Sequence, residues 1–386
     1  MGPITEPLRR QELPPAAAGL RDRWLAWRDR LLASAGFRRW AAAFPLTRPI
    51  ARRRAAALFD LGAGFVYAQV LAACVRLHLF DRLAIGPQSA AALAPQLGLA
   101  PDAAERLLAA AAALDLVSRR SGGRYGLGRL GAACVDNHAV AAMLEHHALL
   151  YADLVDPVAL LRGEGRPTTL ERYWSYARAP QPGALPPEQV DHYSALMATS
   201  QPMVAAEILA AYPLARHRCL LDVGGGEGAF LAAAAHRAPE LRLVLFDLPA
   251  VAERAKRRFL AEGIAPRAVA VGGNFLADPL PVGADIVSLI RVVHDHDDPA
   301  ALTILRAARR ALPSGGTLLL AEPMAGTPGA RPMGDAYFGF FLLAMGSGQP
   351  RTFERLAEMV RTAGFKDCRA LPTRMPMLTR VLVAHV

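Results

Sequence analysis

A run of alternating histidine and aspartate side chains has the residue types to move a proton or to bind a metal ion. The segment RVVHDHDD places His294, Asp295 and His296 directly after the apolar run LIRVV, which is typical of a buried strand. A neutral imidazole is a suitable general base near neutral pH. Alternating His and Asp could also bind a divalent cation, but no second cluster completes a coordination sphere, so we predict no metal. A polar loop without chemistry is the remaining alternative.

A glycine-rich turn precedes this segment in the chain. LLDVGGGEGAF places Gly224 and Gly226 between a strand and a helix, where glycine permits a tight turn and the close approach of a ligand. Asp247 ends the next strand, LVLFD, 21 residues after Gly226, where a carboxylate would face a ribose at the carboxyl edge of a sheet. Acids at Asp222 and Glu227 would repel a pyrophosphate, and the turn does not read GxGxxG. A nucleoside with a positively charged tail fits better, and S-adenosylmethionine is such a ligand.

The two halves of the sequence differ in the pattern of their apolar residues, and this pattern predicts the elements that must position these residues. Short apolar runs alternate with helical patterns in the C-terminal half, which predicts a parallel sheet covered by helices on both faces. The N-terminal half is helical, and the Pro-rich segment ARAPQPGALPPEQ lies between the halves. We therefore predict an α/β protein with a basic arm over 1–54, a helical domain over 55–185 and a ligand-binding α/β domain over 186–386.

The helical domain contains the order helix, helix, β-hairpin, which is typical of a winged helix. Ser89 and Asp102 are the expected N-caps, Gly98 is the expected end of the first helix, and Gly122-Gly123 is the expected hairpin turn. The second helix, DAAERLLAAAAALDLV, has almost no side chains that read bases, so we predict no nucleic-acid partner.

Positive charge is concentrated in the N-terminal arm. The net charge of the chain is +10, and residues 1–54 alone hold twelve arginines against four acidic residues. Trp24 and Trp27 share one helical face with Leu31 and Leu32, with arginines around it. Basic amphipathic helices that carry Trp bind anionic bilayer surfaces, which predicts peripheral membrane contact through the arm. A solvated helix that packs on the next domain or on a second subunit is the alternative.

The remaining composition is typical of a cytoplasmic protein. Hydrophobic residues make up 53% and charged residues 20%, which argues against disorder. The apolar stretch Leu61 to Val75 is 15 residues long, shorter than the roughly 20 that span a bilayer, so we predict a buried or intersubunit helix. The start lacks a secretory signal pattern, and four scattered cysteines suggest neither disulfides nor zinc.

Five motifs resemble a known family. LLDVGGGEGAF, LFDLP, GGNF, RVVHDHDD and LLLAEPM follow the order and spacing of S-adenosylmethionine-dependent O-methyltransferases that carry a winged-helix dimerisation domain. The resemblance covers roughly residues 60–386. It implies a winged-helix-like dimerisation domain followed by a Rossmann-like class I methyltransferase domain, a homodimer, and S-adenosylmethionine as the methyl donor.

The resemblance also assigns roles to single residues. Those expected to contact the cofactor are Gly224, Gly226, Asp247, Gly273, Asn274, Phe275, Arg291 and Gln201. Asn274 stands where the family has Asp, which keeps an acceptor and loses the charge. His294 is the expected general base, and Asp295 and Glu322 are expected to orient it. The family often has a further acid where this chain has Pro350, so the orientation of the base is expected to depend on Glu322.

Segments around residues 52–81, 145–163 and 321–346 look closer still to the branch of the family that methylates acyclic carotenoids in purple photosynthetic bacteria. This likeness implies a lipophilic acceptor with a tertiary hydroxyl, whose proton would leave late because a carbinol is a weak acid. An apolar pocket should receive it. The expected pocket residues are Met197, Phe338, Phe341 and Met345. Such apolar stripes are equally typical of a plain core.

Two other functions fit the same sequence. A methyltransferase for a phenolic secondary metabolite would share the fold and the cofactor. A winged-helix regulator could retain a methyltransferase-like domain as a ligand sensor. The intact His294 beside an intact glycine-rich turn favours an enzyme.

Overall fold

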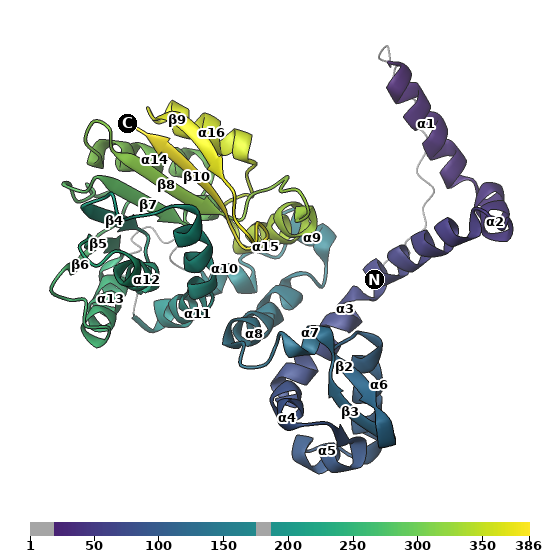
Figure 1. Cartoon of the computed structure of the whole chain (residues 1–386). Helices are drawn as coiled ribbons and strands as arrows, with labels where there is room; N and C mark the ends of the chain where they lie inside the picture. The colour runs from purple at the N-terminus through teal and green to yellow at the C-terminus, as the bar shows by residue number, and fades with distance from the viewer. Residues whose placement is uncertain (1–18, 175–186) are drawn as a thin grey trace. The chain divides into compact units, whose positions relative to one another are not determined.

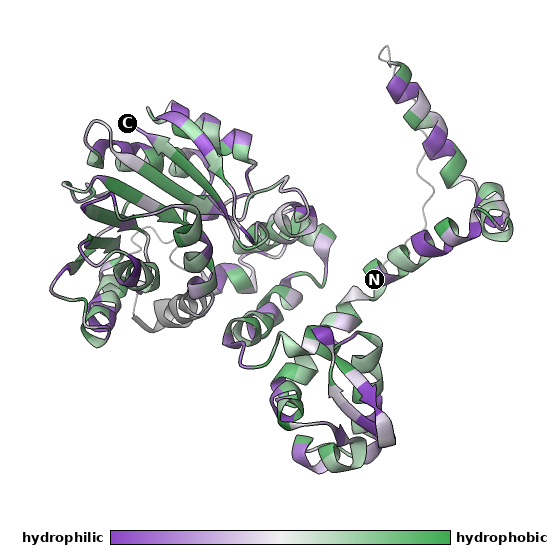
Figure 2. Cartoon of the chain, viewed as in Figure 1, coloured by the Kyte–Doolittle hydropathy of each residue, from purple (hydrophilic) through white to green (hydrophobic). Residues whose placement is uncertain are grey.

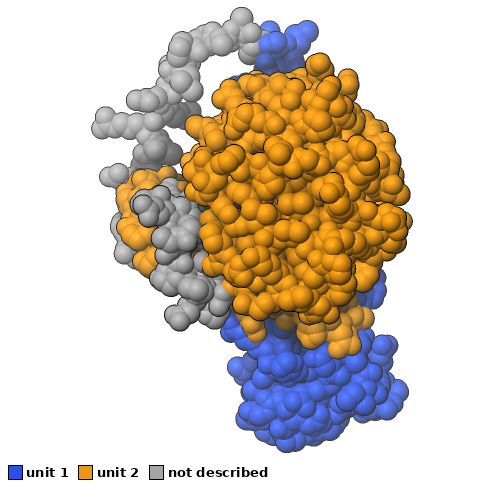
Figure 3. All heavy atoms as spheres, turned by 90° about the vertical axis from the view of Figure 1, so that its left-hand side faces the viewer, with its two compact units in different colours: residues 1–131 blue, residues 132–386 orange. Residues whose placement is uncertain are grey.

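The computed structural model describes residues 19–174 and 187–386, and for 187–198 it describes the backbone alone. The chain forms two compact units, Met1–Gly131 and Ala132–Val386 (Figure 3). The predicted domain boundary between residues 185 and 186 lies outside the described residues.

Three helices begin the first unit (Figure 1). They are α1 (Leu20–Ala33), α2 (Ala35–Ala43) and α3 (Arg48–Arg76). Ser34 separates the first two because its side chain accepts a hydrogen bond from the backbone N–H of Phe37 and so caps α2. The third helix starts with a proline in its first turn and continues for 29 residues. It therefore passes without a break through the predicted boundary at 54 and 55.

Helix α3 is apolar over most of its length and yet poorly covered (Figure 2). Only Ala72 and Cys74 of this helix are buried. Its exposed large side chains are Ile50, Leu58, Phe59, Leu61, Phe65 and Val66. Of the two predicted alternatives, a buried or an intersubunit helix, the single chain does not show the buried one: α2, α4 (Leu79–Ile85) and α6 (Pro101–Ala113) pack against α3 but leave most of it uncovered. By length and composition α3 could also cross a membrane, although helices of soluble proteins pass the same test.

The winged-helix pattern is confirmed in the remainder of this unit. Its other elements are β1 (Gln88–Ser89), α5 (Ala90–Leu97), β2 (Val117–Arg120) and β3 (Arg124–Leu127), with strand order β1-β3-β2. Ser89 caps α5, and Gly98 ends it in the left-handed conformation, as predicted. Asp102 is not an N-cap: α6 begins at Pro101 with Ala100 before it, so Asp102 lies in the first turn. Gly122 and Gly123 form the hairpin turn, both with positive φ.

The second unit begins with helices and continues as an α/β sheet (Figure 1). The helices are α8 (His138–Asp153), α9 (Pro157–Leu161), α10 (Thr169–Tyr173) and α11 (Pro187–Ala211). The strands are β4 (Cys219–Val223), β5 (Arg242–Asp247), β6 (Ala268–Gly272), β7 (Ile286–Ile290), β8 (Thr317–Glu322), β9 (Lys366–Leu371) and β10 (Arg380–His385). They form one sheet in the order β6-β5-β4-β7-β8-β10-β9, parallel except for β10, which is antiparallel to both neighbours. This Rossmann-like arrangement confirms the predicted fold class.

Helices cover both faces of the sheet, which explains why its central strands are apolar throughout. On one face α14 (Asp298–Ala311) and α16 (Phe353–Thr362) pack into the core. On the other lie α11, α12 (Ala229–Arg237) and α13 (Pro249–Ala261). All five residues of β4 and of β7 are buried. Since β4 to β8 are parallel, the segments that follow them meet at one edge, where ligands bind in such folds.

Candidate active site

The glycine-rich turn follows β4 in a conformation that only glycine adopts easily. Gly224 and Gly226 have φ of 68° and 58°, and the N–H of Gly224 donates to the carbonyl of Phe246 at 2.8 Å. A Cβ on Gly224 would lie 2.7 Å from a methyl group of Val292, so this glycine is also needed for close packing. A Cβ on Gly226 would have no neighbour within 4 Å. The turn therefore presents an open face above Gly226.

Asp247 links this turn to the end of β5. One carboxylate oxygen accepts the N–H of Gly226 at 2.8 Å, and the other accepts the N–H of Leu248 at 2.7 Å. Burial raises the pKa of Asp247 to about 6, against the lowering effect of these two hydrogen bonds. The carboxylate thus fixes the turn at the position where the sequence predicts a ribose.

Asp222 lies beneath the turn and is fully buried. Its Oδ1 accepts a hydrogen bond from Ser288 of the neighbouring strand at 2.5 Å. Its Oδ2 has no hydrogen-bond partner in the part of the chain that the structure describes, and it lies against the backbone of Gly225. Burial raises the pKa of Asp222 to about 7, opposed by the hydrogen bond from Ser288. A buried carboxylate oxygen of this kind favours a cationic or amino donor nearby.

His294 lies in a short 3-10 turn, Val293–Asp295, that follows β7. Its Nδ1 contacts the carboxylate of Glu322 at the end of β8, and its Nε2 lies 2.9 Å from Oδ1 of Asp295. Glu322 is itself positioned by the N–H groups of Val292 and Val293, at 3.2 and 2.8 Å. Burial would lower the pKa of His294, but the two carboxylates outweigh it and raise this pKa to about 10. The two carboxylates thus favour the protonated form of the ring.

Aromatic side chains lie next to this histidine. The ring of Phe338, at the start of α15 (Phe338–Met345), meets His294 edge-on with centroids 5.9 Å apart. Phe341 stacks on Tyr337 at 5.8 Å, and the Tyr337 hydroxyl lies 2.8 Å from Nε2 of His147 on α8. Met345 is fully buried at the other end of α15. A polar pair thus interrupts an otherwise apolar surface.

The other expected cofactor residues lie around the same edge. Phe275 meets the ring of His296 edge-on at 5.4 Å, and Oδ1 of Asn274 accepts the N–H of Leu276 at 3.0 Å. Gly273 packs closely against Phe246. Arg291 follows β7 with a φ of 55°, and its guanidinium donates to Ser200 of α11 at 2.8 Å.

Two further expected residues lie on α11. Gln201, the residue after Ser200, is half-buried. The side chain of Met197 lies outside the described residues. No group of three or more His, Cys, Asp or Glu side chains in the described part of the chain is placed to hold a metal ion.

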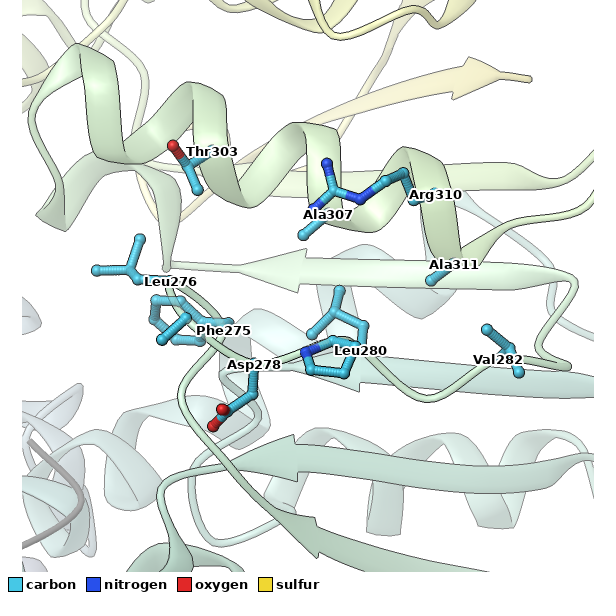
Figure 4. Close-up of a pocket in the computed structure, with 11 residues that line it drawn as sticks. Phe275, Leu276, Asp278, Leu280, Val282, Thr303, Ala307, Arg310 and Ala311 are labelled. Carbon is cyan, nitrogen blue, oxygen red and sulfur yellow. The ribbon is translucent and has the colours of Figure 1, made fainter.

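Phe275 also lines a hollow of about 370 Å³ (Figure 4). The loop after β6 and one face of α14 line it, including Leu276, Thr303 and Ala307. Phe275 is the only residue that it shares with the expected site. It contains neither the glycine-rich turn nor His294.

Comparison with known proteins identifies the family. The O-methyltransferase domain matches residues 151–366, more than half of the chain, and an O-methyltransferase dimerisation domain matches residues 59–137. The chain belongs to the O-methyltransferases. The prediction of this family from five sequence motifs is confirmed.

Among its relatives, this O-methyltransferase is 43% identical to a demethylspheroidene O-methyltransferase of Cereibacter sphaeroides, over 96% of this chain and 97% of the relative. It is 40% identical to an enzyme of the same name from Rhodobacter capsulatus, over 88% and 84% of the two chains. A solved O-methyltransferase from neocarzinostatin biosynthesis, in complex with S-adenosylmethionine and a naphthoic acid, is 29% identical. The superposition covers 83% of this chain and 96% of the solved chain, with a TM-score of 0.62.

Two residues of this O-methyltransferase that bond the candidate site were not predicted from the sequence. Ser288 is a single polar residue within the apolar strand IVSLI, and that isolation is a signal that could have been used. Arg351 is buried and bonded to the turn that carries His294. It lies 55 residues after His296, to which it donates, and nothing in the sequence links the two positions.

Proposed function

We propose that this O-methyltransferase transfers a methyl group from S-adenosylmethionine to the tertiary 1-hydroxyl of acyclic carotenoids, a step of the demethylspheroidene-to-spheroidene type. The observation that carries the proposal is the 43% identity, over nearly both whole chains, with a demethylspheroidene O-methyltransferase. The arrangement of acids and histidine at the carboxyl edge of the sheet is compatible with it.

The residues at this edge fit the methyl donor. S-adenosylmethionine, when bound, supplies an electrophilic methyl group. Asp222 offers to an amino group a buried oxygen that has no partner among the described residues, and Asp247 offers a carboxylate at the end of β5 to ribose hydroxyls. The open face at Gly226 leaves room between them. We assign the flanking contacts to Gly224, Gly273, Asn274, Phe275, Arg291 and Gln201.

His294 is the proposed general base, and its two carboxylate partners suit a weakly acidic acceptor. The raised pKa makes the neutral form of His294 a stronger base than an ordinary imidazole, and this neutral form becomes the main one only as the pH approaches about 10. Asp295 and Glu322 stabilise the imidazolium that forms when Nε2 takes the proton. Because Asp295 lies on Nε2 here, we expect it to move aside when the acceptor hydroxyl binds. The proton leaves late, as the new carbon–oxygen bond forms.

The acceptor is proposed to lie against α15. Phe338 borders His294 directly, and Phe341 continues the apolar surface toward Tyr337. Met197 and Met345 are assigned to the same pocket. The Met345 side chain is wholly buried in this structure, so its contribution is the packing that supports Phe341.

Labelled methyl transfer to a 1-hydroxy acyclic carotenoid in detergent, with a simple phenol in parallel, tests this function. We expect transfer to the carotenoid, and we expect its loss in His294→Ala. Transfer to the phenol alone would keep the family and reject the acceptor. Near-normal turnover by His294→Ala would reject the base.

We further propose a cytoplasmic homodimer that contacts the membrane surface through the basic arm. The dimerisation domain at residues 59–137 and the uncovered apolar face of α3 support the dimer. In the arm, Trp24 and Trp27 are more than half exposed, and ten arginines face two acids over residues 19–54. Flotation of the full chain with anionic and with neutral liposomes tests the contact. We expect binding to the anionic ones alone, and loss of binding in a Trp24→Ser, Trp27→Ser double variant.

A further inference from the structure

Three methionine side chains lie exposed outside the site assigned above. Met203, Met375 and Met377 have exposed fractions of 37%, 46% and 49%. The other methionines whose side chains the structure describes are buried or half-buried. Methionine is usually an interior residue, so three exposed ones need an explanation.

Two of them lie on the connection from β9 to β10, residues 372–379. Strand β10 is antiparallel to β8, and its first residue, Arg380, pairs with Glu322 at the carboxyl end of β8. The connection therefore emerges at the edge where Glu322 contacts His294. Met377 precedes Arg380 by three residues, so their Cα atoms are at most about 11 Å apart.

Helix α11 joins this connection to the candidate site. Its Ser200, Met203 and Glu207 are spaced by three and four residues, so they share one face of the helix. Ser200 accepts a hydrogen bond from Arg291 of the site. Glu207 accepts the backbone N–H groups of Arg374 and Met375, at 2.6 and 2.9 Å. Met203 therefore lies between a contact to the site and a contact to the methionine connection.

These contacts decide what the surface presents. The Glu207 carboxylate satisfies two backbone donors of the connection, at Arg374 and Met375, and the Met375 and Met377 side chains are exposed. Methionine is flexible and polarizable, which allows it to follow an apolar ligand of irregular shape. A small polar acceptor would have no use for such a surface.

We infer that Met203, Met375 and Met377 form a subsite for the hydrocarbon chain of the acceptor, where the chain leaves the site at the carboxyl edge. The inference rests on the proposed function. An acyclic carotenoid whose terminal hydroxyl reaches His294 is far longer than a phenol, and the rest of it must lie outside the reacting centre. The subsite offers an apolar path for that remainder, three residues along the chain from Arg380, the strand partner of Glu322.

The test compares a long and a short acceptor that carry the same tertiary-alcohol end: a 1-hydroxy acyclic carotenoid and a short terpenoid alcohol. The variants are Met375→Gln with Met377→Gln, and Met203→Gln. Leu260→Gln is the matched control, because Leu260 is an exposed apolar residue of α13 with a 69% exposed fraction. We expect KM for the long acceptor to rise about tenfold in the double variant, from lost apolar contact. KM for the short acceptor and kcat for both should be unchanged, and the control should match wild type.

Four results would overturn the inference. They are an unchanged KM for the long acceptor, an equal rise for both acceptors, loss of the dimer in the double variant, and loss of vesicle flotation with KM intact. The last two would assign the surface to a second copy or to lipid. A wild-type protein inactive on both alcohols would reject the proposed function, and the subsite with it. If the wild type is active and the double variant has an unchanged KM for the long acceptor, the subsite alone is rejected.

Discussion

Arg351 anchors the backbone turn that carries His294. Its guanidinium donates to the carbonyls of Val293 and His296, at 2.9 and 2.7 Å, so it bonds the residue before and the second residue after position 294. Two neighbours of Arg351 complete the contact: the N–H of Gln349 donates to the carbonyl of His294, and the Ser347 hydroxyl donates to that of Asp295. Four consecutive carbonyls, 293 to 296, are therefore bonded by the segment 347–351. This segment contains Pro350, at the position where the resemblance to the family predicts an acid.

Substitution of Arg351 should lower the rate of methyl transfer more than it affects cofactor binding. Arg351 is buried and also pairs with Asp298 at 2.8 Å, so its loss frees the turn and leaves Asp298 to its remaining partners, Arg355 and Gln349. We expect Arg351→Gln to reduce kcat about 100-fold, as misplacement of a base by an ångström does. The Kd of S-adenosylhomocysteine should stay within about threefold, because the glycine-rich turn has other supports.

Arg351→Lys provides the control for this prediction. Lysine keeps the charge and one hydrogen bond, so we expect it to recover about tenfold of the lost kcat. An equal loss of cofactor affinity and rate in both variants would show a general loss of structure instead.

Gly348 should tolerate no side chain. Its φ is +82°, and a Cβ there would meet the carbonyl oxygen of His294, a backbone atom that cannot move without disturbing the turn. We expect Gly348→Ala to lower the free energy of unfolding by about 3 kcal/mol. Gly339→Ala is the comparison, because Gly339 lies in α15 with nothing within 4 Å of its Cβ position. That variant should be neutral or stabilising by about 0.5 kcal/mol. Urea unfolding measures both, and equal destabilisation would contradict the steric argument.

The fold was predictable because its strands are uniformly apolar and its turns contain glycine. The alternation of apolar runs with helical patterns is enough to predict a parallel sheet. Asp247 lies at the end of its strand as predicted, and there it accepts the N–H of Gly226. The winged helix was predictable for the same local reasons, at Ser89, Gly98 and Gly122. Asp102 was misassigned because Pro101 already starts the helix, and a proline is favoured in that first position.

Contacts between distant segments were not predictable. Arg351, Glu207 and Ser288 each bond a partner more than fifty residues away, and no local pattern links either end. The coverage of α3 was left open between two alternatives for a related reason. An apolar helix must be covered by something, but the sequence does not say whether the cover belongs to the same chain.

Removal of the Asp295 carboxylate should shift the pH dependence of methyl transfer toward acid. A base must be neutral, so with a His294 pKa near 10 the wild-type rate should rise through the neutral range and level off only near pH 10. In Asp295→Asn one of the two carboxylates that raise this pKa is gone, and we expect the plateau to begin at a lower pH. Single-turnover rates between pH 6 and 10 measure the shift. An unchanged profile would show that another group limits the rate.

Asp222→Asn should stabilise the chain above neutral pH and weaken cofactor binding at the same time. The pKa of Asp222 is raised to about 7, from the 3.8 of an unperturbed carboxyl, so the folded chain holds this proton more tightly than the unfolded chain. The stability of the folded state therefore falls as pH rises from about 4 to about 7, and the loss persists above that range. Asparagine cannot ionise and should abolish this part of the pH dependence. We expect a gain on the order of 1–3 kcal/mol at pH 8 and none at pH 4.

The loss of binding has a separate cause. The substitution removes the charge of the buried carboxylate whose Oδ2 we assign to the amino group of S-adenosylmethionine, so affinity should fall about tenfold or more. Urea unfolding at pH 4 and 8 and calorimetric titration with S-adenosylhomocysteine separate the two effects. Ser288→Ala is the matched variant, because it removes the donor to Oδ1 and leaves Oδ2 in place. It should alter stability with little change in affinity. If both variants lose affinity equally, Asp222 acts through the shape of the turn and not through a contact of its own.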